Sequence, residues 1–248
     1  MNFTILNFDS LDSTNTEIIK RAKQGASEGL CVVAREQTAG RGRHGRVWIS
    51  EKDAGFYFSL LLRPTIENKF LPLITLMTAV AVFDVLTELY DLEPDIKWAN
   101  DLHVNDKKIS GILAEMIETN AGLAVVVGIG INLQSSVFPA ELKDSATSMA
   151  AESGRKIDRE MLLKSLTEKL AKFYDVLQGA NGAAQIRDEW TQRSSYAQGK
   201  RVTVKLADGQ FEGTTRGIAE NGALRVETET GAIKIVTAGD VERLRKTA

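Results

Sequence analysis

Seven consecutive residues, Gly40-Arg41-Gly42-Arg43-His44-Gly45-Arg46, limit the folds open to this chain more than any other segment. Three glycines in so short a run oppose helix and strand alike, because glycine loses the most backbone freedom on ordering and offers no side chain to pack. The segment must be an irregular loop between regular elements. Glycines also let backbone amides approach a ligand, and each guanidinium can donate two parallel hydrogen bonds to a phosphate or carboxylate.

The loop alone leaves two interpretations open. It could be a mobile basic segment that binds nucleic acid nonspecifically through phosphates, or part of a specific small-molecule site. Gln37 and Trp48 flank it. A tryptophan beside a phosphate-binding loop can stack on an adenine, although a tryptophan packs more often in a core. These neighbours favour the specific site.

Hydrophobic periodicity predicts alternating strands and helices through the first part of the chain. Strands are expected at Phe3–Phe8, Leu30–Ala34, Phe56–Leu62, Ile96–Trp98, Leu102–Val104, Lys108–Ile117 and Leu123–Ile131. Helices are expected from the Asp12–Asn15 cap to Gly25, and over Phe70–Tyr90, Asp158–Leu177 and Ala183–Thr191.

After Gln198 the pattern changes. Asp208-Gly209, Asn221-Gly222 and Thr230-Gly231 separate short alternating runs, which is typical of β-hairpins. We therefore expect a larger domain over residues 1–195 and a small all-β domain over residues 196–248, which at that size should lean on its neighbour.

Composition is that of an ordinary soluble protein, with 43% hydrophobic and 26% charged residues. The formal net charge of −2 gives no global basic surface for nucleic acid. The single cysteine, Cys31, excludes an internal disulfide and fits a reducing compartment. No signal-peptide pattern and no apolar run of roughly twenty residues is present. We expect a cytoplasmic protein that does not bind membranes.

Two further segments can carry chemistry. In Lys97-Trp98-Ala99-Asn100-Asp101, a lysine at a strand end can neutralise charge that develops during attack on phosphorus. Spacing alone favours the plainer alternative, an exposed lysine before a turn. In the second segment, Gly128 and Gly130 let a ligand lie against a strand backbone. The dinucleotide-binding fingerprint is excluded because its third glycine, following helix and distal acid are missing.

Together these segments resemble the biotin–protein ligase family in order and spacing, from about residue 8 to 135. Gln37–Trp48 is similar to the family's biotin and adenylate loop, and Lys97–Asp101, followed by Lys107–Glu115, to its Lys-Trp-Pro-Asn-Asp motif. Gly128–Asn132 matches its Gly-x-Gly-Ile-Asn strand, and Ser13–Asn15 its early Ser-Thr-Asn. The resemblance implies an α+β fold. We expect a mixed β-sheet catalytic domain with helices packed mainly on one face, and a small C-terminal SH3-like β-barrel.

The family joins biotin and ATP into biotinyl-5′-adenylate and pyrophosphate, and a lysine of a biotin carboxyl carrier protein domain then attacks the mixed anhydride. Carried over by motif, the biotin-binding residues would be Ser13, Thr14, Asn15, Gln37, Gly40, Arg41, Gly42, Arg43, Lys97, Gly111, Gly128 and Gly130. The ATP- and adenylate-binding residues would be Arg41, Arg43, Arg46, Trp48, Asn100, Lys108 and Asn132. Lys97 and Arg43 would be catalytic. Mg²⁺ is expected with the ATP phosphates and not in a protein metal cluster.

The resemblance also implies individual roles. Lys97 would lie between the biotin carboxylate and the α-phosphate, and Arg41 and Arg43 would bind the carboxylate and the phosphates. Trp48 would stack on adenine. The loop would order only with ligand, because burial protects the adenylate from water.

Some residues depart from the family pattern. Ala99 stands where proline is common, which should loosen the turn, and His44 replaces an arginine, which lowers the charge of the loop. We expect no catalytic role for His44 and no metal role for His103, because separated histidines without cysteine partners make no metal site. Cys31 is expected to be a small buried strand residue.

Three alternatives remain open. A lipoate–protein ligase shares the acyl-adenylate chemistry but must accommodate a dithiolane, against which the polar Ser13, Thr14 and Gln37 argue. A nucleic-acid-binding module predicts an aromatic face, yet Phe211 is the one aromatic residue after Tyr196. A protein that only binds biotin has no need of Lys97. Because the catalytic pattern begins within the first fifteen residues, we expect neither a helix-turn-helix nor repressor activity. A homodimer through a strand edge of the 108–131 hairpin is a further hypothesis.

Overall fold

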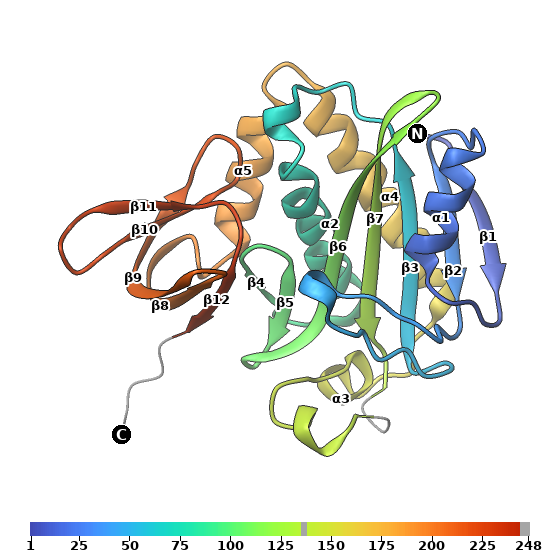
Figure 1. Ribbon diagram of the computed structural model, residues 1–248. Helices are drawn as coiled ribbons and strands as arrows, with labels where there is room; N and C mark the ends of the chain where they lie inside the picture. Colours follow the sequence, from blue (N-terminus) through green and yellow to red (C-terminus); the bar gives the residue numbers. More distant parts are fainter. Residues whose placement is uncertain (135–137, 244–248) are drawn as a thin grey trace.

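The computed structural model describes residues 1–134 and 138–243, and its centre is a seven-stranded mixed sheet (Figure 1). The strand order is β1-β2-β3-β7-β6-β5-β4. β1 and β2 run parallel, and the other described neighbours run antiparallel. The strands are β1 (Thr4–Phe8), β2 (Leu30–Ala34), β3 (Gly55–Leu62), β4 (Asp95–Lys97), β5 (Asp101–Val104), β6 (Lys107–Thr119) and β7 (Gly122–Asn132).

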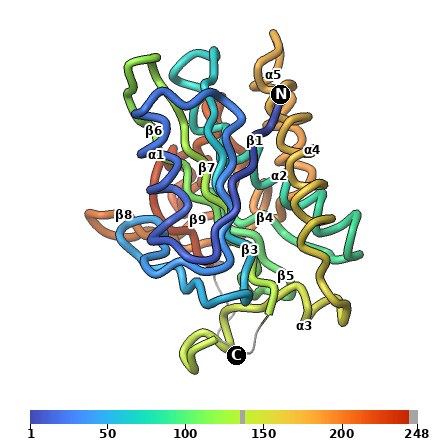
Figure 2. Tube along the Cα trace, turned by 90° about the vertical axis from the view of Figure 1, so that its right-hand side faces the viewer, coloured from blue at the N-terminus to red at the C-terminus, as the bar shows by residue number. Residues whose placement is uncertain are grey.

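Helices cover both faces of this sheet, unequally. Figure 2 shows α1 on one side, and α2 and α4 on the other. The larger core lies between the sheet and the α2, α4 and α5 layer, as expected, and α1 encloses a smaller second core. The helices are α1 (Thr14–Lys23), α2 (Leu73–Tyr90), α3 (Met149–Ser153), α4 (Arg159–Gln178) and α5 (Gly182–Arg193). The α+β prediction is confirmed.

The long helix α2 is a core element. By length and composition it could cross a membrane, with a mean hydropathy of 1.7, but 72% of that stretch is buried inside the protein. It packs against α4 and α5 as well as the sheet, which explains why apolar residues surround it instead of forming a single stripe. The helix begins at Leu73 and not at Phe70, because Phe70 closes a separate 3-10 turn.

The C-terminal residues form a five-stranded antiparallel sheet in the order β11-β10-β9-β8-β12. Its strands are β8 (Gln198–Leu206), β9 (Gly209–Ile218), β10 (Leu224–Glu227), β11 (Ile233–Val236) and β12 (Asp240–Arg243). This sheet contacts the larger domain: the Trp98 indole N–H donates a hydrogen bond to the Gly222 carbonyl at 2.9 Å. The 1–195 and 196–248 boundaries stay a prediction, and residues 244–248 lie outside the described ones.

The predicted elements match the described ones to within a few residues at their ends, with one added α-helix. The short helix α3 was not predicted. Strand β7 lies between β3 and β6, so it has no free edge for a dimer. On β6, the described pairing with β5 ends at Gly111, which leaves the later residues paired with β7 alone. The hypothesis of a dimer through a strand edge therefore applies only to β6.

Candidate active site

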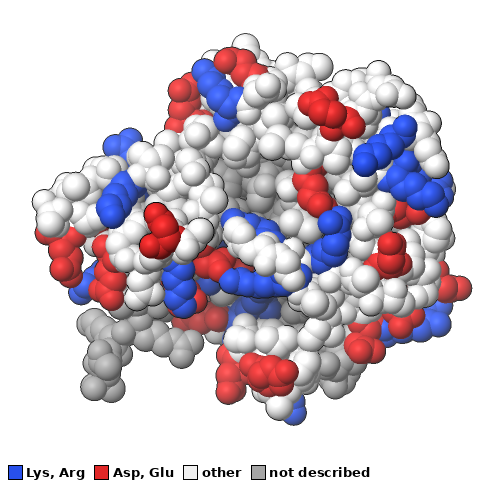
Figure 3. Space-filling view, viewed as in Figure 1, with Lys and Arg blue, Asp and Glu red and all other residues white. Residues whose placement is uncertain are grey.

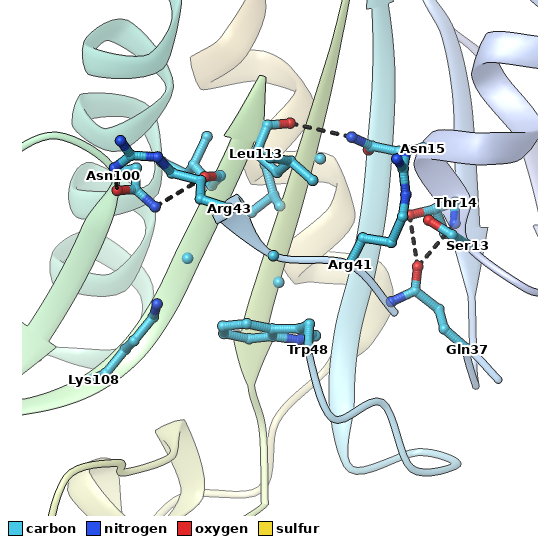
Figure 4. Close-up of a pocket in the computed structure, with 16 residues that line it drawn as sticks. Ser13, Thr14, Asn15, Gln37, Arg41, Arg43, Trp48, Asn100, Lys108 and Leu113 are labelled. Atoms are coloured by element: carbon cyan, nitrogen blue, oxygen red, sulfur yellow. Dashed lines mark hydrogen bonds between the residues drawn. The ribbon is translucent and has the colours of Figure 1, made fainter. Parts of the chain in front are cut away.

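A polar pocket opens on the sheet face that carries α1, between β6, β7, the first turn of α1 and the arginine loop (Figure 4). Most of its lining residues are ones that the sequence singled out: Ser13, Thr14, Asn15, Gln37, Arg41, Gly42, Arg43, Trp48, Asn100, Lys108, Gly111, Gly128 and Gly130. Ile112, Leu113 and Ile129 complete it. Tertiary folding therefore joins all four sequence segments in one cavity.

One end of the pocket is a buried polar cluster around the start of α1. The Gln37 carboxamide oxygen accepts from Thr14 N at 2.8 Å and from Thr14 Oγ1 at 3.1 Å, and its nitrogen donates to Ser50 Oγ at 2.8 Å. The fully buried Ser59 hydroxyl lies 2.7 Å from Thr14 Oγ1 and 2.6 Å from Asn15 Oδ1. Because these groups satisfy one another, they are held in fixed orientations that suit a polar ligand head.

A carboxylate extends this cluster towards the loop. Glu115 Oε2 accepts from Asn15 Nδ2 at 2.7 Å, and the two Glu115 oxygens accept from Arg41 Nη1 at 3.0 Å and Nη2 at 2.7 Å. This is a bidentate guanidinium–carboxylate pair, the strongest geometry for such contacts. The Arg41 guanidinium is therefore engaged beside Asn15.

The other end of the pocket holds a second set of basic groups (Figure 4). Arg43 Nη1 donates to Asn100 Oδ1 at 2.5 Å. The Asn100 amide in turn donates to Asp101 Oδ1 at 2.9 Å and to the Ile112 carbonyl at 3.1 Å. Lys108 Nζ lies 2.8 Å from Asp101 Oδ1. In Figure 3, lysine and arginine side chains lie along the lower part of the hollow at the centre of this face, with acidic side chains beside them.

Trp48 forms the floor of the pocket. A Cβ atom on Gly130 would lie 2.5 Å from the indole and one on Gly111 would lie 2.9 Å from it. Both glycines therefore let the ring approach the sheet. The Lys108 ammonium lies 5.3 Å from the ring centroid, a cation–π distance, and the buried Trp48 Nε1 has no described hydrogen-bond partner.

The arginine loop is a short irregular hairpin. Trp48 N donates to the Gly40 carbonyl at 3.0 Å, and Gly42 N donates to the Arg46 carbonyl at 2.7 Å. A 3-10 turn at Arg43–Gly45 closes the hairpin, with His44 in the left-handed region at φ 55°. The loop is irregular, as its glycines predict, and each arginine side chain leaves it in a different direction.

Two predicted basic residues lie outside the pocket lining. Lys97 ends β4, where burial lowers the pKa of its ammonium below the usual range while the Asp101 carboxylate opposes that shift. Arg46 reaches the other domain and pairs with Asp240 of β12. Burial raises the pKa of Asp240, but the hydrogen bond and charge of Arg46, together with the charges of Arg43 and His44, shift it downwards overall.

Two other predicted residues are used by the protein itself. A Cβ atom on Gly40 would lie 2.3 Å from the Trp48 carbonyl oxygen, so this glycine permits loop packing. The Asn132 amide donates to the Thr147 carbonyl at 2.9 Å and to that of Lys108 at 3.3 Å. The ligand contacts of Lys97, Arg46, Gly40 and Asn132, like those of the residues that line the pocket, stay predictions.

Cys31 is buried in β2 and burial raises the pKa of its thiol to about 12, which confirms a packing role. Among residues 1–134 and 138–243 no group of three His, Cys, Asp or Glu side chains could hold a metal ion. The Trp98–Ala99 peptide bond is cis.

Sequence reasoning missed Glu115, Ser59 and Asp240 as site residues. Strand alternation places Glu115 on the same face as Gly111, and that signal was available. Ser59 is a polar residue inside the apolar strand β3, which is a second usable signal. Asp240 comes from the other domain, and no pattern in the sequence indicated that it would lie near the arginine loop.

Known proteins resemble this chain in sequence and in fold. Residues 7–132 match the biotin/lipoate A/B protein ligase family, and residues 198–244 match the biotin protein ligase C-terminal domain. The bifunctional ligase/repressor BirA of Bacillus subtilis is 41% identical over 94% of this chain and 72% of its own length. The biotin–[acetyl-CoA-carboxylase] ligase of Paracoccus denitrificans is 33% identical over 93% and 96%.

A solved structure gives the same result. The biotin protein ligase of Aquifex aeolicus, in complex with biotin and ATP, superposes with a TM-score of 0.84 at 30% identity, covering 97% of this chain and 99% of that one. Fold and site thus define an acyl-adenylate-forming ligase. The chain belongs to the biotin/lipoate A/B protein ligase family, as a biotin protein ligase. The resemblance drawn from the motifs is confirmed.

Proposed function

We propose that the chain activates biotin with ATP to biotinyl-5′-AMP and then transfers biotin to a lysine of a biotin carboxyl carrier protein domain. The observation that carries this proposal is the two-ended pocket, with the buried Thr14–Gln37 cluster at one end and Arg43 and Lys108 at the other. A ureido ring needs its donors and acceptors met when buried. A polyphosphate needs cationic forks.

In the first half-reaction a biotin carboxylate oxygen attacks the α-phosphorus of ATP, and the bond to pyrophosphate breaks. Lys97 is proposed to approach the two anionic groups as the pocket fills. Its desolvated ammonium would act strongly there, because charge is poorly screened away from water. Arg43 would hold the phosphates, and Trp48 would carry the adenine.

In the second half-reaction the neutral amine of the acceptor lysine attacks the acyl carbon. The C–O bond of the anhydride breaks, AMP leaves, and the amine loses a proton as the amide forms. Closure of the loop over the adenylate would exclude water until the acceptor arrives.

Mg²⁺ is proposed to arrive with ATP, because phosphate oxygens are ligands that this ion prefers. It would shield the phosphate charges and the leaving pyrophosphate.

The first test is biotin-dependent exchange of labelled pyrophosphate into ATP by the purified chain with Mg²⁺, with lipoate and octanoate run in parallel. Exchange with biotin alone is expected. Exchange with lipoate instead would assign the chain a different substrate, and exchange with none of the three would contradict adenylation. Mass spectrometry of a carrier domain, beside its acceptor-lysine-to-arginine variant, then tests transfer.

Repressor activity, which two-function relatives such as the Bacillus protein carry in their names, is proposed to be absent here. Gel-shift titration of duplex DNA with the biotin- and ATP-loaded chain tests this. Sequence-specific retention that survives added salt would contradict the proposal.

A further inference from the structure

We propose that Arg41 and Glu115 form a clamp that holds the arginine loop closed over the biotin end of the pocket. Arg41 is then a positioning residue that governs ligand release, and this role replaces the phosphate contact that the family resemblance implies for it. The inference deepens the proposed function and rests on it, because it assigns the ends of the pocket to biotin and to ATP.

The first support is the geometry of the pair. Both terminal nitrogens of Arg41 are engaged by the two Glu115 oxygens, at 3.0 and 2.7 Å. The side chains are 40% and 26% exposed. A bidentate, partly shielded pair fixes direction as well as distance. It joins the loop to β6 beside Asn15, at the edge of the pocket lining.

The second support is the anchoring of Glu115. The carboxylate also accepts from Asn15, whose own oxygen lies 2.6 Å from the buried Ser59 hydroxyl. The clamp is therefore continuous with the polar cluster proposed to receive the ureido ring. A substitution at Glu115 should therefore affect biotin binding more than ATP binding.

The third support is how the loop charges are distributed. Arg41 and Arg46 pair with carboxylates, so neither carries uncompensated charge, whereas Arg43 donates to the neutral carboxamide of Asn100. In Figure 4 the Arg41 guanidinium points towards Asn15, and that of Arg43 lies at the Asn100 end. A polyanion is drawn most strongly to an arginine that no carboxylate pairs with. Among the described residues, Arg43 is the one of these three arginines without such an ion pair.

The test uses Glu115→Gln, Arg41→Gln and the double variant in the full chain, with Glu118→Gln as the matched control. Glu118 is an exposed glutamate three positions along the same strand, so this control removes one charge without touching the clamp. Biotin release is followed by chase without ATP, and the KM for ATP by pyrophosphate exchange.

Each single variant should release biotin about threefold to tenfold faster, because breaking the pair lowers the barrier to opening. The double variant should be no faster than the faster single, since both act on one contact. The KM for ATP should change by less than about twofold, and Glu118→Gln should match the unmodified chain.

A KM for ATP raised about tenfold by Arg41→Gln would overturn the inference, as would additive effects on biotin release. Biotin release is measured without ATP, whereas adenylation is measured by pyrophosphate exchange in the unmodified chain. Failure of the clamp proposal can therefore be distinguished from failure of the proposed function.

Discussion

Gly128 on β7 lies directly beneath the carboxamide of Asn15, and a Cβ atom at Gly128 would lie 2.3 Å from Asn15 Oδ1. Gly128→Ala should therefore push Asn15 away from Ser59 and Glu115. Overpacking of this kind costs about 1–3 kcal/mol, so biotin affinity measured by calorimetry should fall about fivefold to a hundredfold. Unchanged affinity would show that the Asn15 orientation is unimportant for binding.

Lys97→Ala should abolish adenylation while free biotin binding stays detectable, because the ammonium is needed where charge develops and not for the ureido contacts. Pyrophosphate exchange and biotin calorimetry on the same preparation measure the two effects. Because burial lowers the pKa of Lys97, exchange should decline with rising pH earlier than for an ordinary lysine, as the ammonium loses its proton. Unchanged turnover in Lys97→Ala would remove its assigned role.

Arg43→Gly should let the adenylate escape. The variant loses the Arg43–Asn100 contact of 2.5 Å and adds a flexible glycine to the loop. Released biotinyl-AMP acylates bystander lysines, so biotin should appear on an added protein such as serum albumin. We expect a release rate at least about tenfold higher. Retention as tight as in the unmodified chain would contradict the prediction.

Gly222→Ala should weaken the docking of the C-terminal sheet. Gly222 has φ 83°, and its Cβ would lie 2.9 Å from both Leu73 and Leu76 of α2, whereas Gly231 has φ 81° with open space around it. Gly231→Ala is thus a matched control that reports backbone strain alone. The Gly222 variant should lose about 1–3 kcal/mol more in urea unfolding. Equal losses would mean that the contact with α2 contributes nothing.

His103 should make the protein less stable in acid. Burial lowers the pKa of its imidazole from 6.5 to about 4. Between these values the unfolded chain binds a proton that the folded chain does not, so stability falls as pH drops from 6.5 towards 4 and is unaffected above 6.5. His103→Gln should remove that part of the slope, at most about 3 kcal/mol. Urea unfolding across this range measures it, with His44→Gln on the exposed loop as control.

The elements of this protein follow from local pattern. Strand alternation and helical periodicity are properties of neighbouring residues, so β1, β2, β3 and α1 were predictable to within a few residues. The start of α2 lies three residues after the expected Phe70, because the apolar pattern continues from the 3-10 turn at Asn68–Phe70 into the helix at Leu73. The family motifs likewise lie in short contiguous segments. Family membership could therefore be predicted without knowledge of the fold.

The interaction partners of the site residues depend on the tertiary structure. Arg41 meets Glu115 across 74 positions of sequence, and Arg46 meets Asp240 across 194. Strand period shows which face a side chain takes but not which strands pair, and the β3-β7-β6 order sets what lies opposite Asn15. By itself the sequence determined the elements, the motifs and the family. Tertiary structure alone decided which charges neutralise one another, because that depends on distances between atoms that are remote along the chain.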